Sequence, residues 1–71
     1  MTPDHVDKLF TYHAPTEEQK VHYEAVRAAA KDFATVLLAH TPQSADQTAA
    51  IRLLRSCVHT ANGSIALRGQ F

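Results

Sequence analysis

The sequence predicts an all-α protein: a short N-terminal helix followed by a long antiparallel helical hairpin, which assembles into a homo-oligomeric helical bundle. Two long segments carry apolar residues at alternating spacings of three and four, the period of an amphipathic helix. A capping pattern opens each segment, and the stretch "HTPQ" separates them. We expect one domain over residues 1–71, because a chain this short holds no more than one.

The leading segment, residues 1–15, contains "TPDHVDKLF", which predicts one or two helical turns. Thr2 suits the cap of this helix, and Pro3 suits its first position, where a missing N–H costs nothing. Pro15 disfavours helical geometry at Ala14, so the chain is interrupted before the first long helix.

Capping patterns and breakers set the expected bounds of the hairpin. We expect the first long helix over residues 16–40, a loop over 41–44 and the second long helix over 45–68. Thr16 with Gln19, and Ser44 with Gln47, match the capping box. Gly69 is available just past the second helix. Equal helix lengths and a short loop predict an antiparallel pair.

The apolar pattern predicts both the hairpin and its assembly. The stripe on the first helix comprises Tyr23, Val26, Ala30, Phe33 and Leu37, and that on the second comprises Ile51, Leu54, Val58, Ala61 and Ile65. Val36, Leu53 and Cys57 are among the apolar residues that lie off these stripes. Since one partner helix cannot cover all this surface, we infer a homo-oligomer, with ligand sites between protomers.

Composition narrows the classes of partner. Seven basic and seven acidic residues give a formal net charge of zero, which argues against binding to duplex nucleic acid. The single cysteine, Cys57, indicates a reducing cytosol. No apolar run approaches the roughly 20 residues of a membrane span, so we expect no membrane contact.

No pattern in the chain indicates an enzyme. The histidines are His5, His13, His22, His40 and His59. Their spacing matches no usual metal-ligand pattern, and phosphate-loop and dinucleotide motifs are missing. Cys57 falls on an apolar side of its helix, where a buried, inert thiol is the commoner case. We therefore expect no catalytic residue, metal or cofactor.

Several aromatic and basic residues suit a nucleotide better. Tyr12 and His13 precede the opening of the first long helix, where free N–H groups and the helix dipole favour an anion. Arg27 and Lys31 stand four residues apart beside Tyr23. Together these residues could form a clamp, with rings for a base and a guanidinium for a phosphate.

The clamp has a geometric requirement and a simpler alternative. Arg27 lies about 16 Å along the helix from its start, so Tyr12 reaches it only if the leading segment folds back or belongs to another subunit. In the alternative, Tyr12 packs on the helix while Arg27 pairs with Glu24 or Asp32. Composition and spacing alone favour this alternative.

The second helix carries a further polar group comprising Arg52, Arg55, Thr60, Asn62 and Ser64. Such residues commonly bond back to their own helix, and that interpretation is the default. If several copies of the helix meet at a symmetry axis, the same residues would instead line a polar cup.

The strings "YHAPTEEQ", "YEAVRAAAKDFA", "TPQSADQTAAIRLLR" and "TANGSIAL" together carry a resemblance over about residues 10–67. The chain resembles the small phage proteins of the helical-hairpin family shared by the anti-CBASS and Thoeris anti-defence sponges. The resemblance implies a protein without enzymatic activity that forms compact helical oligomers, typically hexamers. Family members sequester the cyclic nucleotide or cyclic ADP-ribose signals of bacterial immunity.

The resemblance also implies roles for particular residues. Tyr12 and Arg27 match the positions that hold the base and phosphate of a cyclic dinucleotide between protomers, and His13, Lys31 and Tyr23 stand beside them. The residues matching a separate cyclic trinucleotide pocket near a threefold axis are Arg55, Thr60 and Asn62.

The function expected from these features is sequestration, without degradation, of cyclic oligonucleotide messengers in the cytoplasm of the infected bacterial host. This would block anti-phage signalling such as CBASS. Two rivals predict different behaviour: a structural or protein-binding hairpin would oligomerise without a nucleotide, and an enzyme would turn the signal over.

Overall fold

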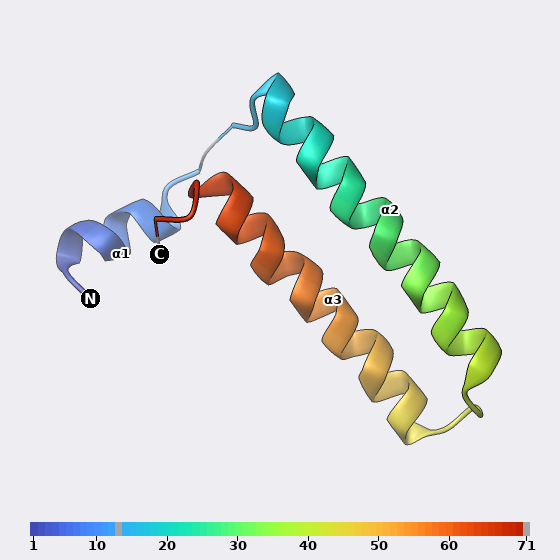
Figure 1. Cartoon of the computed structure of the whole chain (residues 1–71). Coiled ribbons are helices and arrows are strands. Elements are labelled where there is room, and N and C mark those ends of the chain that lie inside the picture. The colour runs from blue at the N-terminus through green and yellow to red at the C-terminus, as the bar shows by residue number, and fades with distance from the viewer. Residues whose placement is uncertain (13, 71) are drawn as a thin grey trace.

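The computed structural model describes residues 1–12 and 14–70, which form three helices. These are α1 (Pro3–Phe10), α2 (Glu17–His40) and α3 (Ala45–Ala66). Figure 1 shows α2 and α3 running antiparallel side by side, with α1 extending from the open end of the hairpin, near the C-terminus. The described residues contain no strand, so the expected all-α class is confirmed.

Each helix starts at a residue that the capping patterns indicated. Thr2 Oγ1 accepts a hydrogen bond from the His5 backbone N–H at 3.2 Å, and Pro3 follows at the first helical position. Thr16 and Gln19 form both halves of the predicted capping box. Thr16 itself is the cap, so α2 begins one residue after the expected start.

Only one of the two hydrogen bonds expected for the second capping box forms. Ser44 Oγ accepts from the Gln47 N–H at 3.1 Å, as expected. The Gln47 amide, however, donates to the backbone oxygen and the hydroxyl of Thr41, both at 3.1 Å. The short loop brings the end of α2 within its reach, so Gln47 fastens the loop instead of completing the box.

Helix α3 ends at Ala66, two residues before the expected end at 68. Arg68 adopts φ +53° and Gly69 φ +72°, and left-handed backbone cannot continue a right-handed helix. The Gly69 N–H closes the terminus by donating to the Ser64 carbonyl at 3.0 Å. Gly69 thus follows the helix as expected, but the left-handed turn begins one residue earlier, at Arg68.

The contact between α2 and α3, here called the seam, follows the predicted stripes with one exception. The half-buried apolar side chains include Tyr23, Val26, Ala30, Ala34 and Leu37 on α2, and Ile51, Leu54, Val58, Ala61 and Ile65 on α3. Phe33, predicted to lie on the stripe, is 54% exposed. The small Ala34 lies in the seam in its place, and the Phe33 ring lines one face of the hairpin.

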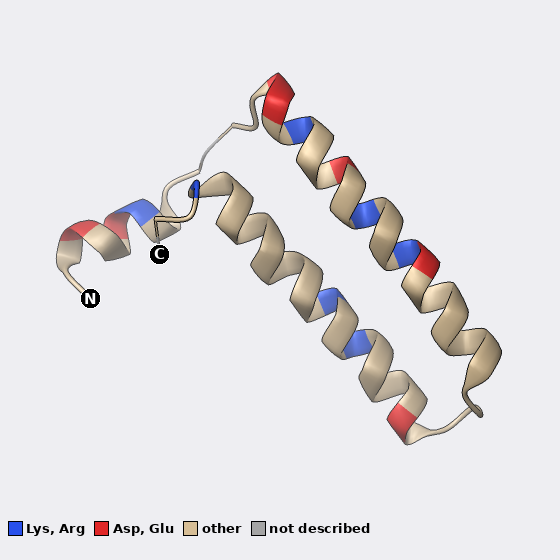
Figure 2. Cartoon of the chain, viewed as in Figure 1, with Lys and Arg blue, Asp and Glu red and all other residues tan. Residues whose placement is uncertain are grey.

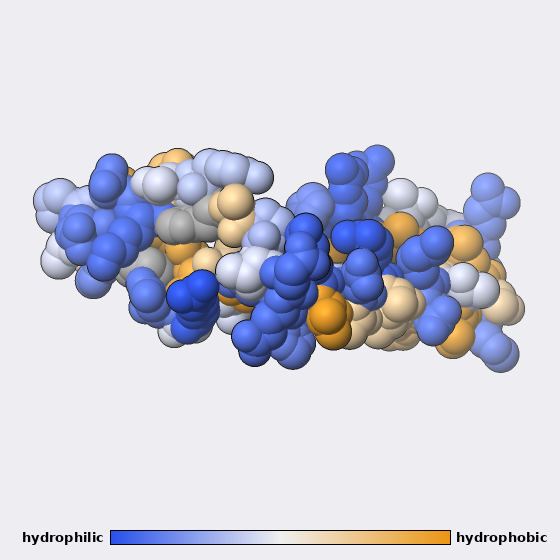
Figure 3. Space-filling model, turned by 90° about the horizontal axis from the view of Figure 1, so that it is seen from above, coloured by the Kyte–Doolittle hydropathy of each residue, from blue (hydrophilic) through white to orange (hydrophobic). Residues whose placement is uncertain are grey.

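The part of the chain that the structure describes has no buried core of its own. None of the described residues is buried, and α1 packs against neither α2 nor α3. Phe10 is 85% exposed and Leu53 70% exposed, and Figure 3 shows hydrophobic atoms open to solvent among hydrophilic ones. Within the described residues, no helix combines the length and apolar character that crossing a membrane requires.

Candidate functional site

A shallow groove along one face of the hairpin gathers basic residues from both long helices. It has a volume of about 220 Å³, and we call it the basic groove. Its lining comprises Arg27, Ala30, Lys31 and Ala34 of α2, and Ile51, Leu54, Arg55, Val58 and His59 of α3. Figure 2 shows the lysine and arginine positions along the middle of both helices.

Helical spacing explains this gathering. Arg27 and Lys31 are four residues apart, and so are Arg55 and His59, so each pair projects from one side of its helix. The antiparallel arrangement of α2 and α3 turns both pairs to the same face of the hairpin. Between them the seam supplies an apolar floor that includes Ala34.

The charges of the basic groove are not balanced locally. No acidic side chain lines it, and the ion pairs found among the described residues lie elsewhere. Lys8 pairs with Asp4 at 3.3 Å, and Lys20 pairs with Glu17 at 3.0 Å. The expected alternative, a pair between Arg27 and Glu24 or Asp32, does not form in the described part of the chain. The groove therefore offers a positive surface to an anion.

The basic surface continues toward the loop. A second groove of about 350 Å³ shares Ile51 and Arg55 with the first and adds Arg52 together with the polar side chains of Gln47 and Thr48. The row of basic residues on this face thus extends over about two turns of α3, from Arg52 to His59.

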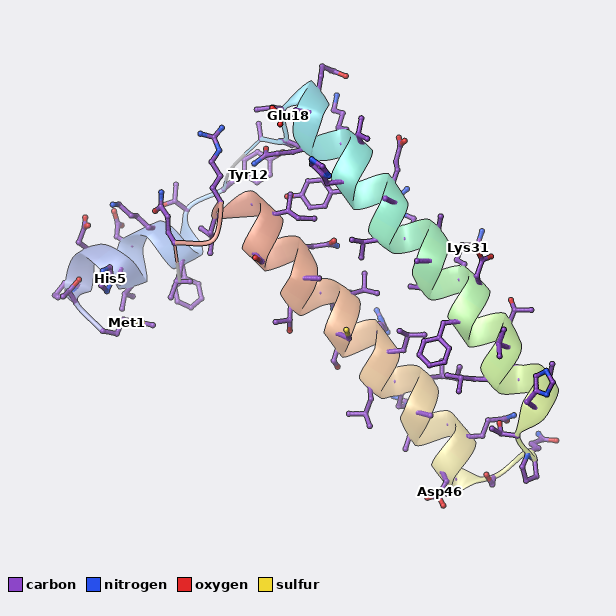
Figure 4. All side chains as sticks on the ribbon, viewed as in Figure 1. Met1, His5, Tyr12, Glu18, Lys31 and Asp46 are labelled. Carbon is purple, nitrogen blue, oxygen red and sulfur yellow. The ribbon has the colours of Figure 1, made fainter. Side chains whose placement is uncertain are left out.

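A larger hollow of about 520 Å³, here called the end hollow, lies at the open end of the hairpin. Its lining comprises Lys8, Tyr12, Ala14, Gln19, Ala66, Leu67, Arg68 and Gln70. Tyr12 is 85% exposed there. Figure 4 shows Tyr12 near the start of α2 and Lys31 well along that helix. Within one chain, therefore, the structure does not bring Tyr12 to Arg27.

The opposite face of the hairpin carries a groove of different chemistry, here called the apolar groove. It has a volume of about 260 Å³ and is lined by Val26, Ala29, Ala30, Phe33, Leu54, Cys57, Val58 and Ala61. Every one of these side chains is apolar or a thiol. Cys57 lies on an apolar side of its helix as expected, but the expectation of a buried thiol is wrong for the single chain, because Cys57 is exposed in this open groove.

The family model described as "Acb2/Tad1, hairpin domain" matches residues 2–66, which is most of the chain. The chain belongs to this family. The resemblance to the anti-CBASS and Thoeris anti-defence sponges is thereby confirmed. Comparison with curated proteins and with solved structures gave no match.

This Acb2/Tad1 hairpin combines residues that the family resemblance had assigned to two different sites. Arg27 and Lys31 were expected at a dinucleotide site and Arg55 at a trinucleotide site, yet all three line the basic groove. Tyr23 lies half-buried in the seam. His13 lies outside the described residues.

The remaining trinucleotide residues do not form one patch with Arg55. Thr60 follows Arg55 by five positions, about 140° around the helix axis, and it is exposed on a different side. Asn62 is half-buried, and its Oδ1 atom is buried without a hydrogen-bond partner in the described structure. A site using Arg55 and Thr60 together would need more than one copy of the chain.

The residues that sequence reasoning missed at these sites include His59, Arg68 and Gln19. His59 completes the basic groove, and its spacing from Arg55 repeats that of Arg27 and Lys31, which was a readable signal. Arg68 and Gln19 line the end hollow. They meet at the open end of the hairpin but stand 49 positions apart in the sequence, so no local pattern places them together. Among the described residues, no group of three or more His, Cys, Asp or Glu side chains is arranged to hold a metal.

Proposed function

We propose that this protein binds cyclic oligonucleotide messengers and sequesters them without degrading them. In the cytoplasm of an infected bacterial host, this would keep the messenger from its effector and so block anti-phage signalling such as CBASS. The observation that carries the proposal is the basic groove: cationic side chains from two helices, without an acidic lining residue, in a member of the Acb2/Tad1 hairpin family.

The chemistry of the basic groove suits a phosphodiester. The guanidinium groups of Arg27 and Arg55 can each donate two parallel hydrogen bonds to one phosphate. Lys31 adds a point charge on the same side as Arg27. The apolar floor excludes water beneath the ligand, which strengthens these charge-assisted bonds.

The proposal includes assembly with further copies of the chain. A single chain buries none of its described side chains and leaves the apolar groove open, so association is the direct way to cover that surface. The family resemblance favours a hexamer. In such an assembly Tyr12 and His13 of one copy would approach Arg27, Lys31 and Tyr23 of another around a cyclic dinucleotide.

A cyclic trinucleotide would be bound by a different set of residues, contributed by several copies of the chain. Arg55, Thr60 and Asn62 would come from several copies around an axis, because one chain holds Arg55 and Thr60 on different sides of α3. Neither grouping asks for a catalytic step. Enclosure between copies lowers the rate at which the ligand leaves, and slow release is sufficient for sequestration.

The experiment is isothermal titration of the purified protein with a panel of cyclic dinucleotides and trinucleotides, followed by heating and chromatography of the released ligand. We expect tight binding at less than one ligand per chain, and intact ligand after heating. Arg27→Ala should abolish the binding of the dinucleotide, because it removes a phosphate donor from the basic groove.

Lys20→Ala is the matched control. It removes a cation from the same helix, but one that pairs with Glu17 outside the groove, so binding should persist. Recovery of a cleaved ligand would show an enzyme instead of a sponge. An oligomer that binds nothing across the panel would favour the structural or protein-binding hairpin.

A further inference from the structure

Gln19 has a second interaction beyond its part in the capping box. Its Oε1 atom accepts from the Thr16 backbone N–H at 3.0 Å, which closes the box. Its Nε2 group donates to the backbone oxygen of Ile65 at 3.1 Å, 46 residues away in the chain. One amide side chain thus joins the first turn of α2 to the last turn of α3 across the open end of the hairpin.

The acceptor of this bond is placed where α3 turns. Ile65 lies one residue before the end of the helix, and its carbonyl also accepts from the Arg68 backbone N–H at 3.2 Å. Arg68 has left-handed φ at this turn. The hydrogen bond from Gln19 therefore fixes the Ile65 carbonyl, which also accepts the hydrogen bond that closes the turn at Arg68.

The same side chain also holds the segment that leads to Tyr12. Thr16 is the last residue before α2, and its N–H is the group that Gln19 Oε1 accepts from. Tyr12, Gln19 and Arg68 all line the end hollow. One wall of that hollow comprises Tyr12 and Ala14, here called the Tyr12 segment, and the other comprises residues 66–68, here called the Arg68 turn. The amide of Gln19 bonds the backbone next to both walls, at Thr16 and at Ile65.

We propose that Gln19 is a positioning residue that sets the Tyr12 segment against the end of α3 and thereby prepares Tyr12 for ligand binding. This inference deepens the proposed function and rests on it for the ligand. Gln19 touches no ligand in this proposal. Its effect passes through the orientation of the segment before α2.

The loop end of the hairpin offers a natural comparison. Gln47 occupies the same position after its cap as Gln19 does after Thr16, and its amide also leaves the helix, to bond Thr41. Gln47 therefore fastens the loop end, where no Tyr12 segment is attached. Replacing either glutamine by glutamate should loosen the end of the hairpin where it lies. Only the replacement of Gln19 should also disturb Tyr12.

Gln19→Glu separates the two interactions of Gln19. A carboxylate still accepts from the Thr16 N–H and suits the first turn of a helix, so α2 should keep its start. It cannot donate to the Ile65 carbonyl, and the two oxygens repel each other. We expect ligand affinity to fall about tenfold, with helix content and oligomeric state unchanged.

A second readout does not depend on any ligand. Spin labels at introduced Ser56→Cys and Tyr12→Cys, in a Cys57→Ala background and diluted with unlabelled protein, report the distance between the Tyr12 segment and α3. This distance distribution should broaden in Gln19→Glu and stay unchanged in Gln47→Glu. Affinity is measured in chains with the native Tyr12, and it is compared between the unsubstituted protein and Gln19→Glu only, because Gln47 lines the second groove of the basic surface.

The outcomes separate the inference from the proposed function. If the unsubstituted protein binds no ligand of the panel, the proposed function fails and the role in ligand binding fails with it, whatever the labels show. If it binds, then an unchanged distribution, or an unchanged affinity, in Gln19→Glu overturns the inference while sequestration stands. An equal broadening of the distance distribution in Gln47→Glu would also overturn it, because the effect would then be general loosening of the hairpin.

Discussion

The two faces of the hairpin share a floor but differ at their edges. Ala30, Leu54 and Val58 line both the basic groove and the apolar groove. The basic groove adds cationic side chains such as that of Arg27, and the apolar groove adds apolar side chains such as that of Phe33. The formal net charge of the chain is zero, yet one face of the hairpin gathers basic side chains and the other presents apolar ones. Each face therefore suits a different partner.

This separation suggests a division of work. The apolar face would gain free energy by excluding water, and in the proposed assembly a further copy of the chain would supply matching apolar surface. The basic face gains from charge-assisted hydrogen bonds, which a phosphodiester supplies. Four substitutions or conditions test whether the faces act separately.

The largest effect should come from Phe33→Asp on the apolar face. A charge placed in the apolar groove should disperse the assembly, at a cost of about 2 kcal/mol or more per copy. Since the single chain has no buried residue among those described, helix content should fall as well. Sedimentation velocity and circular dichroism measure the two effects. Thr35→Asp, at an exposed position of the same helix, is the control and should leave both unchanged.

Arg55→Ala on the basic face should have the opposite profile. We expect ligand affinity to fall between about tenfold and a hundredfold, because a hydrogen bond to a charged group contributes about 1.5–3 kcal/mol. The oligomer should remain intact. Calorimetric titration and sedimentation of the same sample test this, and loss of the oligomer would show that the two faces are not independent.

Salt should distinguish the faces without any substitution. Raising the ionic strength from about 0.05 M to about 0.5 M screens the cations of the basic groove, so affinity should fall severalfold. The proposed assembly should be insensitive to the same change if apolar contacts hold it together. Titrations and sedimentation at matched salt concentrations check both halves. Dissociation of the oligomer in high salt would place ionic contacts in its interface.

The smallest effect should come from Gly63→Ala. Gly63 lies inside α3, and a Cβ atom there would meet no atom of the chain within 4 Å. Replacing it should stabilise the helix by up to about 1 kcal/mol and raise the melting temperature, without changing affinity. Thermal unfolding measures the shift. A lower melting temperature would indicate that another copy packs closely against Gly63, and so would identify a third contact surface.

Helix starts were predictable because their hydrogen bonds are local. Thr16 and Gln19 are three residues apart, and their bonds form whatever the rest of the chain does. Gln47 shows the limit of this reasoning, because its amide donates to Thr41 across the loop, and this contact depends on how the loop folds. The end of α3 was placed two residues too far because the left-handed conformation of Arg68 has no signal in its residue type.

The sequence by itself determined the helical hairpin, the helix starts and the membership of the Acb2/Tad1 family, because periodicity and capping act over a few residues. The tertiary structure decided that Arg27 and Lys31 share a groove with Arg55, that Tyr12 lies apart from them, and that Ala34 displaces Phe33 from the seam. Each of these depends on how two antiparallel helices are rotated and aligned against each other. That arrangement is a property of the pair, because it follows from packing between residues distant in the chain.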